Sequence, residues 1–247
     1  MVAVPRFFVP KQSIHGSAAS ISGADAKHIA RVLRMKPEDP IVLCDTEGTD
    51  YIGRIREIGE QCVEVSVERC VPSETEPTVQ ITLFMALPKG DKMDYIIQKT
   101  VELGVWRIVP YSAARCIVRL ADKDRSRKCE RWRRIALEAA KQSGRGVVPE
   151  VAEPISFGDM LRQANAAQMP LFFYEKENNR SLKQALTERN FETVSVIIGP
   201  EGGFEDSEAE QARELNISTV SLGKRILRCE TAPSCALSAI LYQTDNI

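Results

Sequence analysis

Apolar strand-like segments alternate with helical stretches from about residue 74 to the end of the chain, and this alternation restricts the fold more than any other feature. The segments ITLFMALP, RIVPY, PLFFYE and VSVIIGP are each long enough for one buried strand. The clearest helix begins near Asp91 and ends at Gly104, which provides a left-handed stop. Its apolar residues recur at helical spacing: Met93, Ile96, Ile97 and Val101. The pattern predicts an α/β domain with a mainly parallel sheet.

The first seventy residues have a different pattern, made of shorter and more polar strand-like pieces. These are IVLCD, YIGRIREI and QCVEVSVERC, and the last places Val63, Val65 and Val67 on one face by strict alternation. VPSETEPTVQ then interrupts the pattern with two prolines around a polar stretch. The sequence therefore predicts a small β-rich domain over residues 1–73 and an α/β domain over residues 74–247.

Composition excludes several classes of protein. The 33 Lys and Arg against 34 Asp and Glu leave a net charge of -1, so a nucleic-acid partner would need a local basic patch. The seven cysteines include no C-x-x-C pair, which argues against a disulfide framework and a zinc site. No run approaches the ~20 apolar residues of a membrane span. We expect a soluble, cytoplasmic protein with no metal and no membrane partner.

A glycine-rich stretch, IIGPEGGFEDSE, follows the last of these apolar strands. Gly199, Gly202 and Gly203 let backbone approach a ligand, and Ser207 with Glu210 predicts a capping box for the next helix. The spacing matches neither G-x-G-x-x-G nor the P-loop pattern. Glu201 would repel phosphate, which suits a ligand without a phosphate chain, such as the cationic sulfonium S-adenosylmethionine. A tight connection without a ligand is the alternative.

A second unusual stretch, SLGKRILRCETAPSCA, lies near the C-terminus. Gly223 follows a strand-like segment, and a run of cations precedes Glu230 and Thr231. Alone, it is better explained by a charged loop ahead of a helix that Thr231 caps. The helix APSCALSAILYQ that follows has Pro233 in its first turn and many small residues, which permit close approach of a second subunit.

Four motifs, taken in order, resemble the RsmE family of the SPOUT superfamily. They are KGDKMDYIIQKTVELGV, AAKQSGRGVVPEV, IIGPEGGFEDSE and LGKRILRCETA. The resemblance implies a SPOUT-type α/β domain with a deep C-terminal trefoil knot after a PUA-like β-barrel, a homodimer, and S-adenosyl-L-methionine as methyl donor. It implies methylation of uridine N3 in small-subunit ribosomal RNA, free or in the assembled ribosomal subunit. Glu38 stands where the family usually has glycine, which puts the local turn of the barrel in question.

The resemblance also implies a donor pocket in which backbone groups hold the adenine and methionine parts. The residues that correspond to it come from the end of PLFFYE and from the two loops. They are Tyr174, Glu175, Gly199, Pro200, Glu201, Gly202, Gly203, Leu222, Gly223, Arg225, Ile226 and Leu227.

Catalysis at uracil N3 requires orientation of the base and stabilisation of charge, because N3 is a poor nucleophile until its proton leaves. Both histidines, His15 and His28, lie in the first domain. The candidates are therefore Arg228 for the developing anion and Glu201, with Glu230 nearby, for positioning. An alternative is that Glu201 only bonds loop amides while Arg228 and Glu230 form an ion pair. A covalent role for Cys229 is the weaker hypothesis.

RNA would be held by cations, since seven of them lie between Lys123 and Arg134. A solvated charged helix is the ordinary alternative. The predicted RNA contacts are Arg6, Arg31, Arg34, Lys89, Arg125, Arg131, Arg134 and Arg145. Two other functions remain open. A SPOUT ribose 2'-O-methyltransferase is disfavoured because those relatives carry an asparagine-containing SLNVS-like motif, and a non-catalytic RNA-binding assembly factor would keep the fold without activity.

Overall fold

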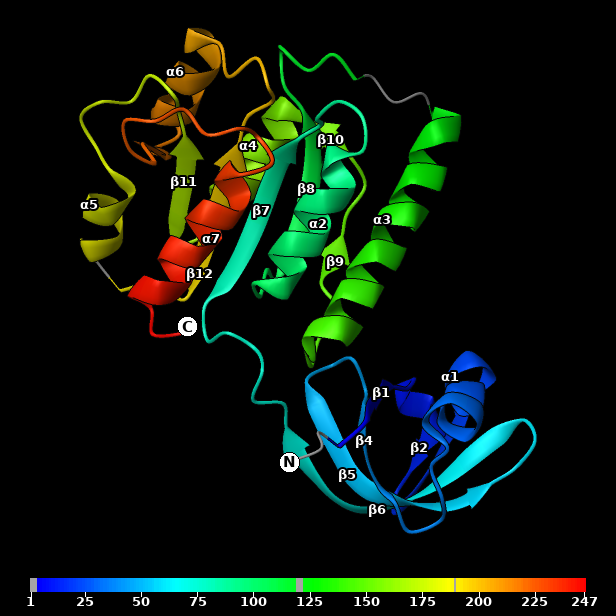
Figure 1. The fold of residues 1–247 in the computed structure, drawn as a ribbon. Coiled ribbons are helices and arrows are strands. Elements are labelled where there is room, and N and C mark those ends of the chain that lie inside the picture. The colour runs from blue at the N-terminus through cyan, green and yellow to red at the C-terminus, as the bar shows by residue number, and fades with distance from the viewer. Residues whose placement is uncertain (1–3, 119–121, 189) are drawn as a thin grey trace. The chain divides into compact units, whose positions relative to one another are not determined.

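The computed structural model describes residues 4–118, 122–188 and 190–247, apart from the side chains of Asp122 and Lys123. The chain divides into two compact units (Figure 1). Unit 1 consists of residues 1–76 with 140–148, and unit 2 of residues 77–139 with 149–247. These units differ from the predicted domains mainly in residues 140–148, which belong with the N-terminal part of the chain.

Unit 1 contains one six-stranded sheet in the order β1-β4-β5-β6-β3-β2. Only β1 pairs in parallel, with β4, and the other neighbours are antiparallel. The strands are β1 Arg6–Phe8, β2 Ile14–His15, β3 Ala18–Ser22, β4 Pro40–Cys44, β5 Thr49–Ile58 and β6 Cys62–Pro72. The helical segments are η1 Lys11–Ser13, α1 Gly23–Lys27 and the π-helical η2 His28–Leu33.

The core of unit 1 confirms the alternation read from the sequence. Val63 and Val65 are buried, and Val67 packs against the same apolar cluster. Glu38 has a φ of 74°, the left-handed region that favours glycine. Its backbone N–H donates to the carbonyl oxygen of Ile55 at 2.8 Å. The turn therefore keeps a glycine-like conformation although glutamate occupies it.

Residues 140–148 are attached to unit 1 by ionic contacts. Arg6 donates to a carbonyl oxygen of this segment at 2.8 Å and pairs with Asp50 at 2.5 Å. The side chain of Arg145 is 3% exposed and pairs with Glu76 at 2.5 Å. Both guanidinium groups are paired with carboxylates inside unit 1, which disfavours the predicted RNA contacts of Arg6 and Arg145.

Unit 2 is built on a parallel sheet, as the sequence predicts. The strands are β7 Gln80–Ala86, β8 Arg107–Ser112, β9 Glu150–Val151, β10 Ile155–Ser156, β11 Met169–Phe173, β12 Thr193–Ile198 and β13 Ser218–Val220. Their order is β10-β8-β7-β12-β11-β13, with β9 also beside β8. Every pairing is parallel. The carboxyl ends of all these strands therefore meet at one edge, where ligands of such sheets bind.

Helices cover both faces of this sheet (Figure 1). They are α2 Lys92–Glu102, α3 Asp122–Ser143, α4 Phe157–Ala164, α5 Leu182–Thr187, α6 Asp206–Glu214 and α7 Ala232–Gln243. Apolar residues of α4 and α6 share one core cluster with Phe84, Tyr111 and Phe172 of the sheet. On the other face, α7 packs against β12 and α2. The predicted stop at Gly104 is confirmed by its φ of 96°.

The start of α6 differs from the prediction. The capping box is formed by Glu205 and Glu208, not by Ser207 and Glu210. The helix begins at Asp206 because Phe204, which is fully buried, fixes the chain just before it. Glu208 also accepts the backbone N–H of Ala114 at 2.9 Å. Within the described part of the chain, no helix is both long enough and apolar enough to cross a membrane.

Candidate functional site

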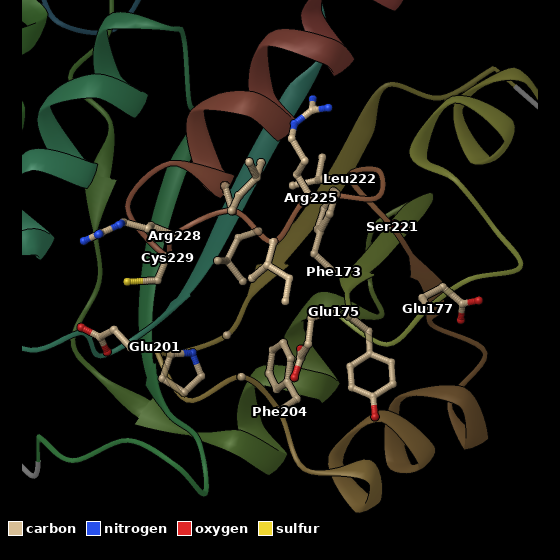
Figure 2. Close-up of a pocket in the computed structure, with 18 of the residues that line it drawn as sticks. Phe173, Glu175, Glu177, Glu201, Phe204, Ser221, Leu222, Arg225, Arg228 and Cys229 are labelled. Atoms are coloured by element: carbon tan, nitrogen blue, oxygen red, sulfur yellow. The ribbon is translucent and has the colours of Figure 1, made fainter.

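A pocket of about 580 Å³ lies where β11, β12 and β13 end (Figure 2). Its walls are the three segments that follow those strands, and its volume falls in the ~300–1,000 Å³ range of small-molecule sites. All of the residues predicted for the donor pocket line it, from Tyr174 and Glu175 through the Gly199–Gly203 loop to Leu227. The structure therefore brings together segments that are separated along the chain. Their role in binding stays a prediction.

Glycine is required at two points of the loop that follows β12. A Cβ on Gly199 would lie 2.8 Å from the ring of Phe204, which is fully buried. That ring packs on Phe172 with centroids 4.1 Å apart. Gly203 has a φ of 67°, and its N–H closes a turn onto the carbonyl oxygen of Pro200 at 2.9 Å. The loop thus keeps its backbone next to the pocket without side chains at these positions.

Tyr174 supports the wall of the pocket. Its hydroxyl donates to Asp206 at 2.5 Å, and the guanidinium of Arg213 lies 5.9 Å from its ring centroid. Burial, together with the hydrogen bond to Asp206, raises the pKa of Tyr174. The phenol therefore stays protonated near neutral pH and acts as a hydrogen-bond donor.

Acidic side chains line one side of the pocket. Figure 2 shows Glu177 on the side opposite Glu201 and Arg228, with Glu175 between them. Glu177 accepts the hydroxyl of Thr219 at 2.6 Å. Burial raises the pKa of Glu177, but the hydrogen bonds it accepts and the charge of Arg213 outweigh burial, so the net pKa is lowered. An ionised carboxylate here favours hydroxyl and cationic groups of a ligand over phosphate.

Lys92 lies at the centre of a charged cluster on the other side. Its Nζ atom lies 3.0 Å from Oε1 of Glu201, 3.3 Å from Oε2 of Glu230 and 3.9 Å from Sγ of Cys229. The interpretation in which Glu230 pairs with Arg228 is wrong, because Glu230 pairs with Lys92. Arg228 is exposed and forms no ion pair with any residue that the structure describes.

Comparison with known proteins identifies the family. Residues 74–241 match the RNA methyltransferase domain family, and residues 21–68 match the RNA methyltransferase PUA domain family. The chain is 36% identical to the ribosomal RNA small subunit methyltransferase E of Bacillus subtilis, with 97% of both chains covered. The chain belongs to the ribosomal RNA small subunit methyltransferase E family.

Two further members of the methyltransferase E family support this identification. The Synechocystis protein is 32% identical, with 95% of this chain and 76% of that protein covered. The crystal structure of the Neisseria gonorrhoeae enzyme, bound to S-adenosyl methionine, superposes with a TM-score of 0.82. That enzyme is 31% identical, with 97% of this chain and 98% of the other covered. These matches span both units.

Glu201 and Glu230, the two acidic residues beside Lys92, are ionised in this methyltransferase. Burial raises the pKa of Glu201, but hydrogen bonds from its own and Lys89's backbone N–H groups and from Lys92 outweigh burial, so the net pKa is lowered. Burial likewise raises the pKa of Glu230, and hydrogen bonds from its own backbone, Cys229 and Lys92 lower it overall. Both carboxylates are therefore anions at neutral pH and weak bases.

Cys229 is a neutral thiol in this environment. Burial and then its hydrogen bond to Glu230 raise the pKa of Cys229 to about 12. Because the thiolate is the nucleophilic form, a covalent role for Cys229 lacks its reactive species near neutral pH.

We expect Cys229→Ala to keep the rate of methyl transfer within about threefold of that of the unchanged protein. Rate assays from pH 6 to 10, with exposed Cys235→Ala as control, check this. Abolished transfer in Cys229→Ala alone would restore the covalent hypothesis.

Several residues that line the pocket of this methyltransferase were not predicted from the sequence. Lys92, Phe173, Glu177 and Ser221 line it without having been predicted. Phe173 and Ser221 could have been found, since each lies at or just after the end of a predicted strand. Lys92 follows β7 in PKGDK, whose letters only partly match a phosphate loop. Its partners are distant in sequence, so no local pattern signals its role.

The predicted RNA contacts that remain are exposed or partly exposed. On α3, the side chains of Arg127 and Arg131 are 81% and 54% exposed, and Arg134 is exposed as well. Arg131 pairs with Asp94 at 2.5 Å. Arg125 is half-buried, whereas the side chain of Lys123 lies outside the described residues. In addition, the side chains of Arg31, Arg34 and Lys89 are exposed.

Proposed function

We propose that this chain is an S-adenosyl-L-methionine-dependent methyltransferase that methylates N3 of one uridine in small-subunit ribosomal RNA. One observation carries the proposal: the glycine loop after β12 and the 222–227 loop share one pocket with Glu201, Arg228 and Glu230. Membership of the methyltransferase E family and the donor-bound Neisseria gonorrhoeae structure support the reaction class and the donor. We favour N3 over a ribose hydroxyl because the last loop, LGKRILRCETA, lacks the asparagine-containing motif of the ribose 2'-O-methyltransferases.

The residues of the pocket fit this donor. Its adenosyl and methionine parts have no phosphate, and the pocket offers apolar walls, the glycine backbone of the loop after β12 and the carboxylates Glu175 and Glu177. We infer that backbone groups of residues 199–203 and 222–227 hold the donor, with the carboxylates near its hydroxyl or cationic groups. When bound, it supplies an electrophilic methyl group on a sulfonium.

The residues on the Lys92 side suit a pyrimidine. Arg228 is a cation with no ion-pair partner in the described structure, so its charge is available to a uracil that develops negative charge at N3. Glu201 and Glu230 are committed to Lys92 by one oxygen each and are suited to positioning the base. Because both are weak bases, solvent is the final acceptor of the N3 proton in this proposal.

The decisive experiment is methylation of purified small ribosomal subunits and of naked small-subunit RNA, taken from cells lacking the protein. The expected product is one 3-methyluridine, mapped by mass spectrometry of RNA fragments, in at least one substrate. A methyl group on a ribose hydroxyl would contradict the N3 assignment. Donor binding by calorimetry without any transfer to either substrate would favour the non-catalytic assembly factor.

We further propose that cations of α3 hold the RNA backbone. Removing one arginine that binds a phosphate lowers the slope of log affinity against log salt by about one. We therefore expect Arg127→Ala with Arg134→Ala to weaken RNA binding and to flatten this slope by about two, while donor affinity is unchanged. Filter binding between low and moderate salt measures it. Arg162→Ala is the matched control, because Arg162 is similarly exposed, at 74%, and lies on α4. An unchanged slope would remove α3 from the RNA site.

The same proposal includes three further expectations: a cytoplasmic location, a homodimer and a trefoil knot. We infer a cytoplasmic homodimer, supported by the small-residue face of α7 and by Tyr242, which is 75% exposed. Light scattering measures the mass of the homodimer.

The trefoil knot is supported by the path of the chain. Ser221 pairs beside Ser181, and the chain then returns from β13 at the sheet edge to pack α7 on β12.

A further inference from the structure

Lys92 occupies a position that helix stability does not explain. It is the first residue of α2, where the partial positive charge of the helix disfavours a cation. Its side chain is a third exposed, and its ammonium group contacts groups from two other segments of the chain. The titratable groups that face it are the carboxylates of Glu201 and Glu230 and the thiol of Cys229. The other charged side chains that line the pocket are Glu175, Glu177, Lys224, Arg225 and Arg228.

One oxygen of each carboxylate in the cluster has no partner on another residue that the structure describes. Oε1 of Glu201 accepts both the backbone N–H of Lys89 and the ammonium of Lys92, each at 3.0 Å. Oε2 of Glu230 lies near Lys92 and Cys229. Neither Oε2 of Glu201 nor Oε1 of Glu230 bonds another residue in the described part of the chain. Their side chains are 27% and 21% exposed and line the pocket.

We propose that Lys92 is a positioning residue, which holds Glu201 and Glu230 so that Oε2 of Glu201 and Oε1 of Glu230 accept the N–H of the pyrimidine substrate. This inference rests on the proposed function. An ammonium group has three donors, and Lys92 directs two of them to carboxylates on different loops. Without it, two anions would lie close together and repel each other. Lys92 therefore acts through the carboxylates and not on the substrate itself.

The position of a carboxylate affects the chemical step more than binding of the donor. An N–H bond to a fixed acceptor orients N3 toward the methyl group, and misplacement of such groups costs rate. Lys92 also favours the ionised form of both acids, because its hydrogen bonds and charge add to the backbone hydrogen bonds that lower their pKa values. A protonated carboxyl group would present a donor in place of an acceptor at this point.

The test compares Lys92→Met, Lys92→Gln and Lys92→Arg with Lys99→Met. Lys99 lies on the same helix, is 36% exposed against 34% for Lys92, and pairs with Glu102 away from the pocket. Single-turnover transfer to small ribosomal subunits is measured from pH 5 to 9 with saturating RNA, and steady-state rates over a range of RNA concentrations give KM. Calorimetry gives donor affinity, and thermal unfolding shows that each variant folds.

We expect Lys92→Met to slow transfer about 10- to 100-fold while donor affinity changes less than threefold. The acid limb of its pH profile is expected to move to higher pH, because removal of the cation raises the pKa of both carboxyl groups. Lys92→Arg is expected to restore most of the rate, Lys92→Gln only a little, and Lys99→Met should match the unchanged protein. Adding Glu201→Gln to Lys92→Met should cost less than the two separate losses combined.

The outcomes separate the two proposals. If the unchanged protein makes no 3-methyluridine, the proposed function fails, and the role of Lys92 toward a pyrimidine fails with it. If it does, and Lys92→Met has the same rate and acid limb, only the role of Lys92 is overturned. A raised KM for RNA with an unchanged maximal rate would also overturn it, because Lys92 would then contact RNA directly. Should Lys92→Met fail to fold, Lys92→Gln and Lys92→Arg decide between these outcomes.

Discussion

Arg228→Ala is expected to slow methyl transfer about 100- to 1,000-fold, the loss typical when a cation or donor that stabilises transition-state charge is removed. The reason is the difference between Arg228 and Lys92. Lys92 is neutralised by two carboxylates, whereas Arg228 is exposed and has no ion-pair partner among the described residues. In the proposed reaction, its charge is therefore available when uracil loses its N3 proton. Single-turnover rates with saturating donor and RNA measure the effect.

The affinity for the donor separates this role from a role in the pocket wall. We expect calorimetry to give Arg228→Ala a donor affinity within about threefold of normal, because the interaction forms only with the reacting base. Arg228→Lys keeps a charge without the planar guanidinium and should recover part of the rate. Arg162→Ala, on the surface of α4, should change nothing. Equal losses of donor affinity and rate in Arg228→Ala would contradict a catalytic role.

Gly199→Ala is expected to lower donor affinity about 10- to 100-fold and the free energy of unfolding by about 1–3 kcal/mol. The added Cβ would lie 2.8 Å from the ring of Phe204. That ring has no room to move, because Phe204 is fully buried and packs on Phe172. The loop must shift instead, and its backbone lines the pocket. Calorimetry with S-adenosylmethionine and urea denaturation measure the two quantities.

Gly158→Ala is the matched control for this substitution. Gly158 lies in α4, where an added Cβ meets nothing within 4 Å. Alanine is favoured over glycine inside a helix by about 1 kcal/mol, so this variant should be slightly more stable and bind the donor normally. Normal donor affinity in Gly199→Ala would show that the loop can shift without effect, and that it is not part of the donor site.

The sequence predicted the elements of unit 2 well because their signals are local. The strands of the parallel sheet are buried on both faces, so each shows as a short continuous apolar run. The C-terminal helix was predicted with the bounds that α7 has, Ala232–Gln243, because proline marks its first turn. The two loops that line the pocket could also be found, since glycines follow strand ends in both. Parallel pairing then brings those strand ends to one edge.

The errors concern interactions between residues far apart in the chain. Arg145 and Arg6 look like any surface cations in the sequence, and only the fold shows that Glu76 and Asp50 neutralise them. Lys92 reaches Glu201 across more than a hundred residues, a separation no motif encodes. The capping box of α6 failed for a local reason. Two pairs at the same spacing compete there, Glu205 with Glu208 and Ser207 with Glu210, and the burial of Phe204 selects the earlier one.

The attachment of residues 140–148 to unit 1 limits how this protein can be cut into pieces. A fragment ending at residue 76 would keep Arg6 and Glu76 but lose the carbonyl groups and the guanidinium that they contact. Burial of a charge without its partner costs about 3–5 kcal/mol, a large share of the stability of a small domain. An N-terminal piece that folds independently would therefore need the 140–148 peptide rejoined to it by a designed linker.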